Sequence, residues 1–463
     1  MPLLKTVTLG CKVNQYETQY LREGLECLGY CEAREDEPAD LCIVNTCTVT
    51  VEGDAKSRKL IRRIARQNPA AEVVVMGCYA TRAPEEVARL PGVAEVITDK
   101  RQLPAWLAGR GLIAPPVGIS TFAERHRAYV KVQDGCSMEC SYCIIPRVRP
   151  VLWSRPQPEI LDEVGRLVAA GHREIVLTGI HLGHYGADLA GGWNLARLVR
   201  DVVRQPGEFR VRLSSLEGAE VTDELLSVLG EHPERVCPHL HVPMQSGSDA
   251  VLCRMRRQWP AERLITRLCR VRSALDRPAL TGDVMVGFPG ETEADFLATC
   301  RAVEAAGFSK LHVFRFSPRQ GTEAAAMPNR VPGQVQRERA ARLAELGDHL
   351  RGEYLRSLAG RRLQVLVEGP ATKPEKGDRV PSGCLLPERP SGCCAQKVPL
   401  RFFSQGRRPL LGTADRYVPV EFLGPENEIG RLVWVVAGQA AGGSILAEER
   451  QLQIENCKLQ NAN

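Results

Sequence analysis

The sequence predicts an α/β fold in three parts: an N-terminal doubly wound parallel α/β domain, a central (βα)6 partial barrel and a small C-terminal all-β barrel. Two observations support this fold class. Short apolar runs alternate with helical segments up to about residue 358, which is typical of parallel sheets. Beyond that point helical periodicity stops and short strand-like runs follow. We expect domains at residues 1–110, 122–358 and 359–450, and a polar tail at 451–463.

The composition is that of a globular protein with more than one domain. The chain has 463 residues, of which 44% are hydrophobic and 25% charged. No apolar run reaches the roughly 18–20 residues of a membrane span, and the N-terminus lacks a signal-peptide pattern. We therefore expect a cytoplasmic protein with no membrane segment. In that compartment thiols stay reduced, so clusters among its 17 cysteines indicate metal binding or catalysis.

The N-terminal hundred residues contain three strand-then-helix units. We expect strands at 5–10, 40–45 and 72–77, and helices at 14–28, 51–67 and 84–90. A cysteine follows each strand: Cys11, Cys47 and Cys78. Ligands of such sheets bind at the carboxyl ends of the strands, so the three thiols are expected at one edge. Ordinary packing of buried cysteines is the alternative, but the shared position of all three favours a cluster site.

The central part repeats the same pattern on a larger scale. Residues 101–127 contain several prolines and little periodicity, and predict a linker. The expected strands are 129–133, 174–178, 209–214, 239–242, 280–286 and 311–316. The expected helices between them are 158–170, 195–204, 261–275 and 293–306. Six such units make three quarters of an eight-strand barrel, whose chemistry lies at the C-terminal strand ends.

The C-terminal part begins after a long charged helix expected at 334–358. Strand-like runs at 361–368, 417–423 and 432–437 predict the small all-β domain. Between the first two, residues 370–411 are rich in Pro, Gly and Arg. This segment predicts a long loop or insertion.

The segment CSMECSYC holds three cysteines, Cys136, Cys140 and Cys143, directly after the first barrel strand. A closed zinc site would need a fourth ligand, and the only nearby histidine is His126, which precedes the strand. An iron–sulfur cube fits better. Its four irons usually take four thiolates, so three cysteines leave one iron open to a bound molecule.

CSMECSYC resembles the motif of the radical S-adenosylmethionine (SAM) superfamily, in which SAM chelates the open iron and is cleaved to a 5′-deoxyadenosyl radical. Several further segments resemble the methylthiotransferase family within it: LGCKVNQYE, NTC, VQDGCSMECSYCIIPRVR, RLSSLEG, HLHVPMQSGSD, GDVMVGFPGET and FRFSPRQGTEAA. The resemblance covers residues 3–368 and 412–448. It implies that Cys136, Cys140 and Cys143 bind a 4Fe-4S cluster and SAM. It likewise implies a second 4Fe-4S cluster on Cys11, Cys47 and Cys78, and a β-domain similar to TRAM, an RNA-binding barrel.

Within the family, LGCKVNQYE and SPRQGTEAA most resemble the branch that adds a methylthio group to C2 of N6-threonylcarbamoyladenosine-37 in tRNA. That activity implies two SAM molecules, the tRNA anticodon stem-loop as partner and a reductant protein; the sulfur donor is not indicated. Alternatives within the family are isopentenyladenosine in tRNA or an aspartate of a ribosomal protein as the acceptor. An alternative of another class is an iron–sulfur RNA-binding regulator without SAM chemistry.

Contacts with SAM are expected from the cluster loop and the later strand ends. The candidates are Tyr142, Thr178, Gly179, Ser214, Gln245 and Asp283. A structural polar role is the alternative for each polar strand-end residue. The basic residues of helix 51–67 are open to two interpretations, a solvated helix face or phosphate contacts with RNA. After CIIP the family usually has YxRGxxRSR, whereas this chain has RVRPVLWSRP, with Pro150 in place of the glycine.

Overall fold

The computed structural model describes residues 1–122, 126–371 and 407–447. Contacts divide the chain into two compact units, Met1–Tyr354 and Leu355–Asn463. The finer division into three domains, with boundaries at 110, 122 and 358, stays a prediction. Among the described residues, no helix has both the length and the apolar character needed to cross a membrane.

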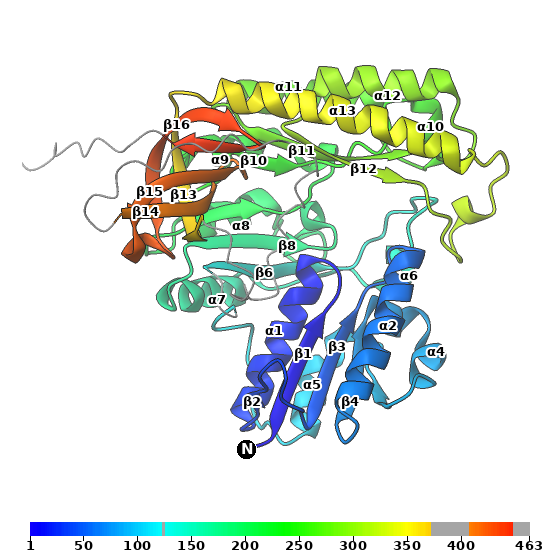
Figure 1. Cartoon of the computed structure of the whole chain (residues 1–463), viewed down its shortest axis with the longest axis vertical. Helices are drawn as coiled ribbons and strands as arrows, with labels where there is room; N and C mark the ends of the chain where they lie inside the picture. Colours follow the sequence, from blue (N-terminus) through cyan, green and yellow to red (C-terminus); the bar gives the residue numbers. More distant parts are fainter. Residues whose placement is uncertain (123–125, 372–406, 448–463) are drawn as a thin grey trace, which may run out of the picture. The chain divides into compact units, whose positions relative to one another are not determined.

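The N-terminal part is a parallel five-stranded sheet in the order β2-β1-β3-β4-β5 (Figure 1). Its strands are β1 Leu3–Thr8, β2 Cys31–Glu32, β3 Leu41–Thr46, β4 Glu72–Gly77 and β5 Val93–Val96. Its helices are α1 Lys12–Cys27, α2 Val51–Gln67, α3 Cys78–Arg82, α4 Pro84–Ala88 and α5 Leu103–Gly109. The three predicted strand–helix units are confirmed. The two short strands β2 and β5 were not predicted, because so few residues show no clear alternation.

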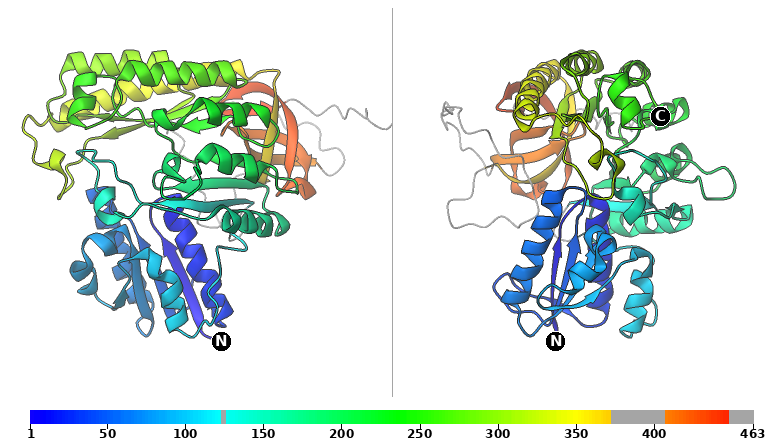
Figure 2. Two further views of the ribbon diagram at one scale, coloured as in Figure 1. Left: turned by 180° about the vertical axis from the view of Figure 1, so that it is seen from behind. Right: turned by 90° about the vertical axis from the view of Figure 1, so that its right-hand side faces the viewer.

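The alternation of side chains along β3 explains why this sheet is covered on both faces. Leu41 and Ile43 lie in the same hydrophobic cluster as Leu21 of α1 and Leu107 of α5. The neighbouring Val44 lies in a second cluster with residues of α2 and α4. Successive strand residues point to opposite faces, so one apolar run buries both layers. The doubly wound arrangement is confirmed, and Figure 2 shows the same layers from behind.

The predicted linker at 101–127 is wrong in its first part. A 3-10 turn, η1 Lys100–Gln102, leads into helix α5, which buries Leu103 and Leu107. Pro104 stands in the first turn of α5. Proline is tolerated there because the first helical N–H groups have no partner within the helix. The proline therefore marks the start of a helix in this segment.

The central part contains all six predicted strands, arranged as two sheets, β7-β6-β8-β9 and β10-β11-β12. Isolated parallel bridges, Val211 to Val236 and Ser215 to His241, connect the sheets. The strands are β6 Arg127–Asp134, β7 Trp153–Ser154, β8 Glu174–Gly179, β9 Arg210–Leu213, β10 His239–His241, β11 Ala279–Val286 and β12 Lys310–Arg315. The predicted partial barrel is thus confirmed, and the two-residue strand β7 is an addition that pairs antiparallel with β6.

Helices cover the outer face of these strands, as α11 and α12 do beside β10–β12 (Figure 1). The helices are α6 Ile145–Val148, α7 Gln157–Ala169, α8 Leu195–Val203, α9 Asp223–Glu231, α10 Asp249–Arg254, α11 Ala261–Ala274, α12 Glu293–Ala306 and α13 Gly333–Ser357. The 3-10 turns are η2 Leu182–His184, η3 Gly218–Glu220 and η4 Glu323–Ala325. Helix α12 has clear start and stop signals: Thr292 and Asp295 form a capping box, and Gly307 ends the helix in a left-handed conformation.

The C-terminal unit contains a closed barrel of five strands in the order β13-β14-β15-β17-β16. The strands are β13 Arg362–Pro370, β14 Arg407–Ala414, β15 Pro419–Pro425, β16 Leu432–Ala441 and β17 Ser444–Ala447, with the 3-10 turn η5 Glu426–Glu428 after β15. The predicted small all-β barrel is confirmed. The predicted insertion at 370–411 is wrong at its end, where residues 407–411 belong to β14. Its residues 372–406 and the predicted tail at 451–463 lie outside the described residues.

Candidate active site with two cysteine triads

The first cysteine triad, Cys11, Cys47 and Cys78, lies at the carboxyl ends of three adjacent strands. Cys11 is the N-cap of α1, Cys47 directly follows β3, and Cys78 is the first residue of α3 after β4. Strands β1, β3 and β4 are neighbours in the sheet. The predicted gathering of these cysteines at one edge is therefore observed.

Two glycines allow the turns that bring this triad together. Gly10 has φ +107°, and a Cβ placed on it would lie 3.4 Å from the Cys47 sulfur. Gly77 has φ +99°, and a Cβ there would lie only 2.3 Å from the carbonyl oxygen of Thr46. Residues with a side chain rarely adopt these conformations. The glycines before Cys11 and Cys78 thus let neighbouring strand ends approach closely.

Asn14 of α1 ties the same strand ends to one another. Its Nδ2 donates hydrogen bonds to the carbonyl oxygens of Leu9, at 2.9 Å, and Thr46, at 3.1 Å. Asn45 in turn donates to the Asn14 carbonyl oxygen at 2.8 Å. Asn14 is almost fully buried. One side chain thereby links the residues that precede Cys11 and Cys47.

The second triad, Cys136, Cys140 and Cys143, lies in the loop after β6. Gly135 has φ +81°, and a Cβ on it would lie 1.9 Å from the carbonyl oxygen of Val151. The N–H of Cys143 donates to the Cys140 carbonyl oxygen at 3.0 Å, which closes a tight turn. A glycine thus precedes the first cysteine here too, again because neighbouring backbone leaves no room for a side chain.

Burial makes most of these thiols reluctant to ionise on their own. It raises the pKa of Cys11, Cys47 and Cys140, and raises the pKa of Cys143 to about 12. Bonds to a positively charged metal group stabilise the thiolate form that burial disfavours. None of the thirteen cysteines among the described residues forms a disulfide. The two triads therefore have the chemistry of iron–sulfur ligand sets.

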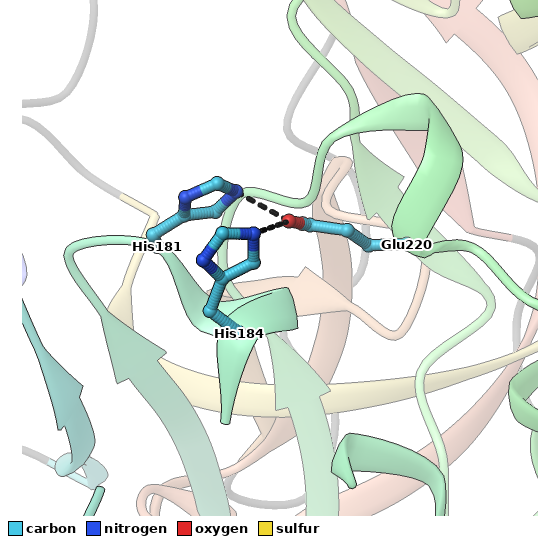
Figure 3. Close-up of side chains that lie close together, drawn as sticks. All are labelled: His181, His184 and Glu220. Carbon is cyan, nitrogen blue, oxygen red and sulfur yellow. Dashed lines mark ion pairs between the residues drawn. The ribbon is translucent and has the colours of Figure 1, made fainter. Parts of the chain in front are cut away.

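His181, His184 and Glu220 form a compact group (Figure 3). This group lies beside the second triad. The imidazoles of His181 and His184 are stacked with centroids 3.7 Å apart, and both approach one oxygen of Glu220. His181 Nδ1 lies 3.5 Å from the sulfur of Cys136. Because His181 contacts a predicted iron ligand, we assign the group to the surroundings of the second triad.

Arg257 approaches the second triad from the loop after α10. Its Nη1 lies 3.6 Å from the sulfur of Cys140, and its Nη2 pairs with the carboxylate of Glu217. Glu217 and Arg257 also line a cavity of about 310 Å³, together with Pro243 and Met244 after β10. The cavity therefore lies at the C-terminal strand ends, where the barrel fold places chemistry.

The predicted SAM-contact residues are spread over the cluster loop, the ends of β8, β9 and β10, and the interior of β11. Tyr142 is half-buried and packs edge-on against Phe288, with ring centroids 6.4 Å apart. Thr178 and Gly179 end β8, and a Cβ on Gly179 would lie 2.9 Å from Oε1 of Gln133. The buried hydroxyl of Ser214 has no hydrogen-bond partner within the described part of the chain. An unsatisfied buried hydroxyl is uncommon and fits a group that faces a ligand.

Gln245 and Asp283 are the remaining predicted contacts. Gln245 adopts a left-handed backbone conformation with φ +65°, which is unusual for a residue with a side chain. Its N–H donates to the Asp283 carbonyl oxygen at 2.8 Å. The Asp283 carboxylate is partly exposed and lies 3.3 Å from Nε2 of His241. Gln245 lies beyond the C-terminal end of β10, whereas Asp283 stands in the interior of β11, so the expected strand-end position is wrong for Asp283. The contact of both residues with SAM stays a prediction.

Sequence reasoning missed a buried charged group between the two triads: Glu17, Lys131, Asp134 and Arg149. These side chains are 2–9% exposed. Three of them stand inside the quoted motifs, in NQYE, VQDG and PRVR. Charged residues are rarely fully buried unless paired, so the available signal was the presence of three of these residues inside the quoted motifs. Pro150, which replaces the family glycine, is exposed directly after Arg149.

Comparison with known proteins assigns both parts of the first unit. The family model "Uncharacterized protein family UPF0004" matches residues 4–99, and "Radical SAM superfamily" matches residues 130–303. In the solved structures, a radical SAM methyltransferase from Kitasatospora setae, TsrM, superposes with a TM-score of 0.51. It is 16% identical, and the match covers 70% of this chain and 75% of that one. This likeness supports the fold.

Curated relatives cover more of the chain at higher identity. The threonylcarbamoyladenosine tRNA methylthiotransferase MtaB of Bacillus subtilis is 37% identical, with 92% of both chains covered. The protein of the same name from Thermotoga maritima is 38% identical, with 80% of this chain and 87% of that one covered. A tRNA-2-methylthio-N(6)-dimethylallyladenosine synthase of Parafrankia is 36% identical, with 79% and 78% covered. The chain therefore belongs to the radical SAM tRNA methylthiotransferase family, whose cofactors are 4Fe-4S clusters and SAM.

Proposed function

We propose that this enzyme adds a methylthio group to C2 of N6-threonylcarbamoyladenosine-37 in tRNA, with two SAM molecules consumed per product. Three relatives named for this acceptor are 37–39% identical over most of the chain, and a fourth, from Rickettsia prowazekii, is 32% identical. Relatives named for the dimethylallyladenosine acceptor are 33–36% identical, which favours the first acceptor by a small margin. Because the family consists of radical SAM enzymes, we drop the alternative that the protein is an RNA-binding regulator without SAM chemistry.

The observation that carries this proposal is the presence of two separate cysteine triads in one compact unit. We assign Cys136, Cys140 and Cys143 to the SAM-binding 4Fe-4S cluster, and Cys11, Cys47 and Cys78 to a second 4Fe-4S cluster. The clusters would supply electron transfer to SAM and a place to hold sulfur. A purine C–H bond has neither useful acidity nor a leaving group, so polar catalysis alone cannot replace its hydrogen with sulfur. The cysteines, for their part, hold and orient both groups.

The proposed partners are the tRNA anticodon stem-loop and a reductant protein, and the expected location is the cytoplasm. The closed C-terminal barrel is a candidate RNA-binding part. Its strand β16 carries a partly exposed Trp434 with the guanidinium of Arg362 centred 5.1 Å from the ring. Exposed aromatic and arginine side chains are typical of surfaces that stack on single-stranded bases.

Iron counting with triad variants tests the two-cluster assignment. We expect about eight irons in the wild type after anaerobic reconstitution, and about four in the triple variants C11A/C47A/C78A and C136A/C140A/C143A. The first variant should still release 5′-deoxyadenosine from SAM and reductant, whereas the second should release none. A wild type that takes up only about four irons would refute the second cluster.

Nucleoside mass spectrometry of tRNA tests the acceptor. Cells that lack the gene should lose the 2-methylthio form of N6-threonylcarbamoyladenosine, and the wild-type gene should restore it. The C136A/C140A/C143A variant is the matched control and should restore nothing. Loss of the methylthiolated isopentenyl nucleoside in place of the threonylcarbamoyl one would overturn the acceptor and leave the reaction type intact.

A further inference from the structure

Arg149 joins the segments that carry the two cysteine triads. Its Nη1 lies 2.8 Å from carboxylate oxygens of both Glu17 and Asp134. Its Nη2 donates to Glu17 at 2.8 Å and to Oδ1 of Asn14 at 3.1 Å. Glu17 and Asn14 belong to α1, which begins directly after Cys11, while Asp134 ends β6. One guanidinium therefore binds both parts of the active unit.

The main chain of Arg149 adds a further contact on the side of the second triad. The N–H of Cys136 donates to the Arg149 carbonyl oxygen at 3.2 Å. Asp134, which accepts from Arg149, also accepts from the N–H of Gly135 at 2.8 Å. Arg149 thereby holds Cys136 both through its own backbone and through the residues just before it.

On the side of the first triad, the contact runs through Asn14. The Asn14 amide accepts from Arg149 and donates to the strand ends before Cys11 and Cys47. Asn14 Oδ1 also lies 3.8 Å from the Cys11 sulfur. A shift of the guanidinium would therefore displace the amide that holds the first triad.

The charges of this group balance, which allows it to stay buried. Lys131 lies 2.8 Å from Glu17 and 2.6 Å from Asp134, so two cations face two carboxylates. Burial would raise the pKa of Glu17, but Arg149 and Lys131 outweigh burial and hold it below its usual range. Buried ion pairs with good geometry are stiff, because breaking one leaves an uncompensated charge. We therefore expect these four side chains to hold the segments that they connect in a fixed arrangement.

We propose that Arg149 is a positioning residue that fixes the two cysteine triads relative to each other. This inference rests on the proposed function, in which one triad generates the radical and the other holds the sulfur. The carbon activated by the radical must meet that sulfur before the radical is lost. A small displacement between the triads would leave SAM cleavage intact and lower the share of cleavage events that give product. Such misplacement can cost roughly a hundredfold in rate.

The test replaces the guanidinium while keeping its charge. R149K retains a cation, but a single ammonium group cannot bind two carboxylates and an amide in the same geometry. Variant and wild type are compared on whichever tRNA the wild type modifies. We expect about eight irons in each, and an increase of about tenfold or more in 5′-deoxyadenosine released per methylthiolated nucleoside. The magnetic coupling between the two reduced clusters, seen by electron paramagnetic resonance, should change as well.

R210K is the matched control. Arg210 is also buried and pairs with a buried carboxylate, Glu174, but its strand β9 carries it at the first residue, away from the C-terminal strand ends. R210K should therefore keep the wild-type product ratio and magnetic coupling. If R149K loads fewer irons than R210K, the double variant E17Q/R149Q is used. It removes one positive and one negative charge, so the net charge of the group is unchanged and the Lys131–Asp134 pair remains.

The outcomes separate this inference from the proposed function. A wild type that forms no methylthiolated nucleoside would defeat the proposed function. The positioning role alone would be defeated by a different result. In that result the wild type forms the methylthiolated nucleoside, and the folded R149K or E17Q/R149Q protein has the wild-type product ratio and the wild-type magnetic coupling. A raised ratio in the Arg149 variants and in R210K alike would also defeat it, since any lost buried pair would then have the same effect.

Discussion

The guanidinium of Arg319 lies 2.6 Å from the carboxylate of Asp54, although Asp54 belongs to α2 of the N-terminal part and Arg319 follows β12 of the central part. Arg319 stands in the SPRQG segment after β12, and Asp54 lies in the first turn of α2, close to Cys47. Arg82 lies 2.8 Å from the same carboxylate oxygen. One buried carboxylate thus compensates two guanidinium groups beside the first triad.

We expect D54N to lower the free energy of unfolding by about 3–5 kcal/mol, because it leaves Arg319 buried without a counter-charge. Anaerobic urea denaturation of the cluster-loaded protein measures the change. E85Q is the control, since Glu85 pairs with Arg89 at 3.5 Å and both side chains are more than four-fifths exposed. Its effect should stay below about 1 kcal/mol. Equal effects of the two substitutions would contradict the prediction.

G77A should prevent the first triad from forming. The added methyl group would meet the Thr46 carbonyl oxygen at 2.3 Å in a conformation with φ +99°. We expect iron content to fall from about eight to about four per chain, with 5′-deoxyadenosine formation retained. G111A is the matched control, because Gly111 has φ +101° but no atom within 4 Å of the added carbon. G111A should lower the free energy of unfolding only by the left-handed strain of about 1–2 kcal/mol. A full iron complement in G77A would disprove the steric argument.

The stability contributed by Glu174 should depend on pH. Burial alone would raise its pKa, but Arg127, Arg210 and Arg212 outweigh burial and hold the pKa well below its ordinary value of 4.5. A carboxylate with a depressed folded-state pKa stabilises the fold above the unfolded-state pKa, and this stability is lost as pH falls toward the folded-state value.

We therefore expect E174Q to be less stable than wild type by about 3–5 kcal/mol at pH 7. The difference in the free energy of unfolding between E174Q and wild type should become smaller as the pH falls below about 4.5. Denaturant unfolding at a series of pH values measures it. E234Q, which removes an exposed carboxylate, is the control for the loss of one acidic group. A difference between E174Q and wild type that stays constant down to pH 3 would speak against the mechanism.

The basic face of α2 should contribute to RNA binding. Lys59, Arg62, Arg63 and Arg66 are exposed, and no ion pair of theirs is found in the ranges that the structure describes. We expect R62Q/R63Q to weaken tRNA binding and to reduce the dependence of log K on log salt by roughly 0.7–0.9 per lost phosphate contact. K56Q is the control on the same helix, because Lys56 already pairs with Glu52 at 2.8 Å. If R62Q/R63Q and the wild type show the same dependence of log K on log salt, this face of α2 does not contact tRNA phosphates.

The position of Cys11, Cys47 and Cys78 at one edge of the sheet could be predicted because the information for it is local. A strand pattern followed by Gly-Cys places a thiol at a strand end, and parallel topology then brings strand ends to one edge. Local patterns also misled at two places. Pro104 suggested a linker where it opens α5, and the Arg- and Pro-rich residues 407–411 suggested a loop where β14 begins. Pro104 was a helix-start signal taken for a loop signal, whereas pairing of β14 with β13 and β15 overrode a composition typical of loops.

The sequence by itself determined the order of the main strands and helices, the six candidate ligands and the family. Each depends on residues close together in the chain or on periodic burial. Only the tertiary structure decided which charges are buried together, as with Arg149 and Glu17, which lie 2.8 Å apart. A charged residue taken alone is expected at the surface. It becomes a buried structural element only when distant segments bring it a partner of opposite charge, and no local pattern encodes that pairing.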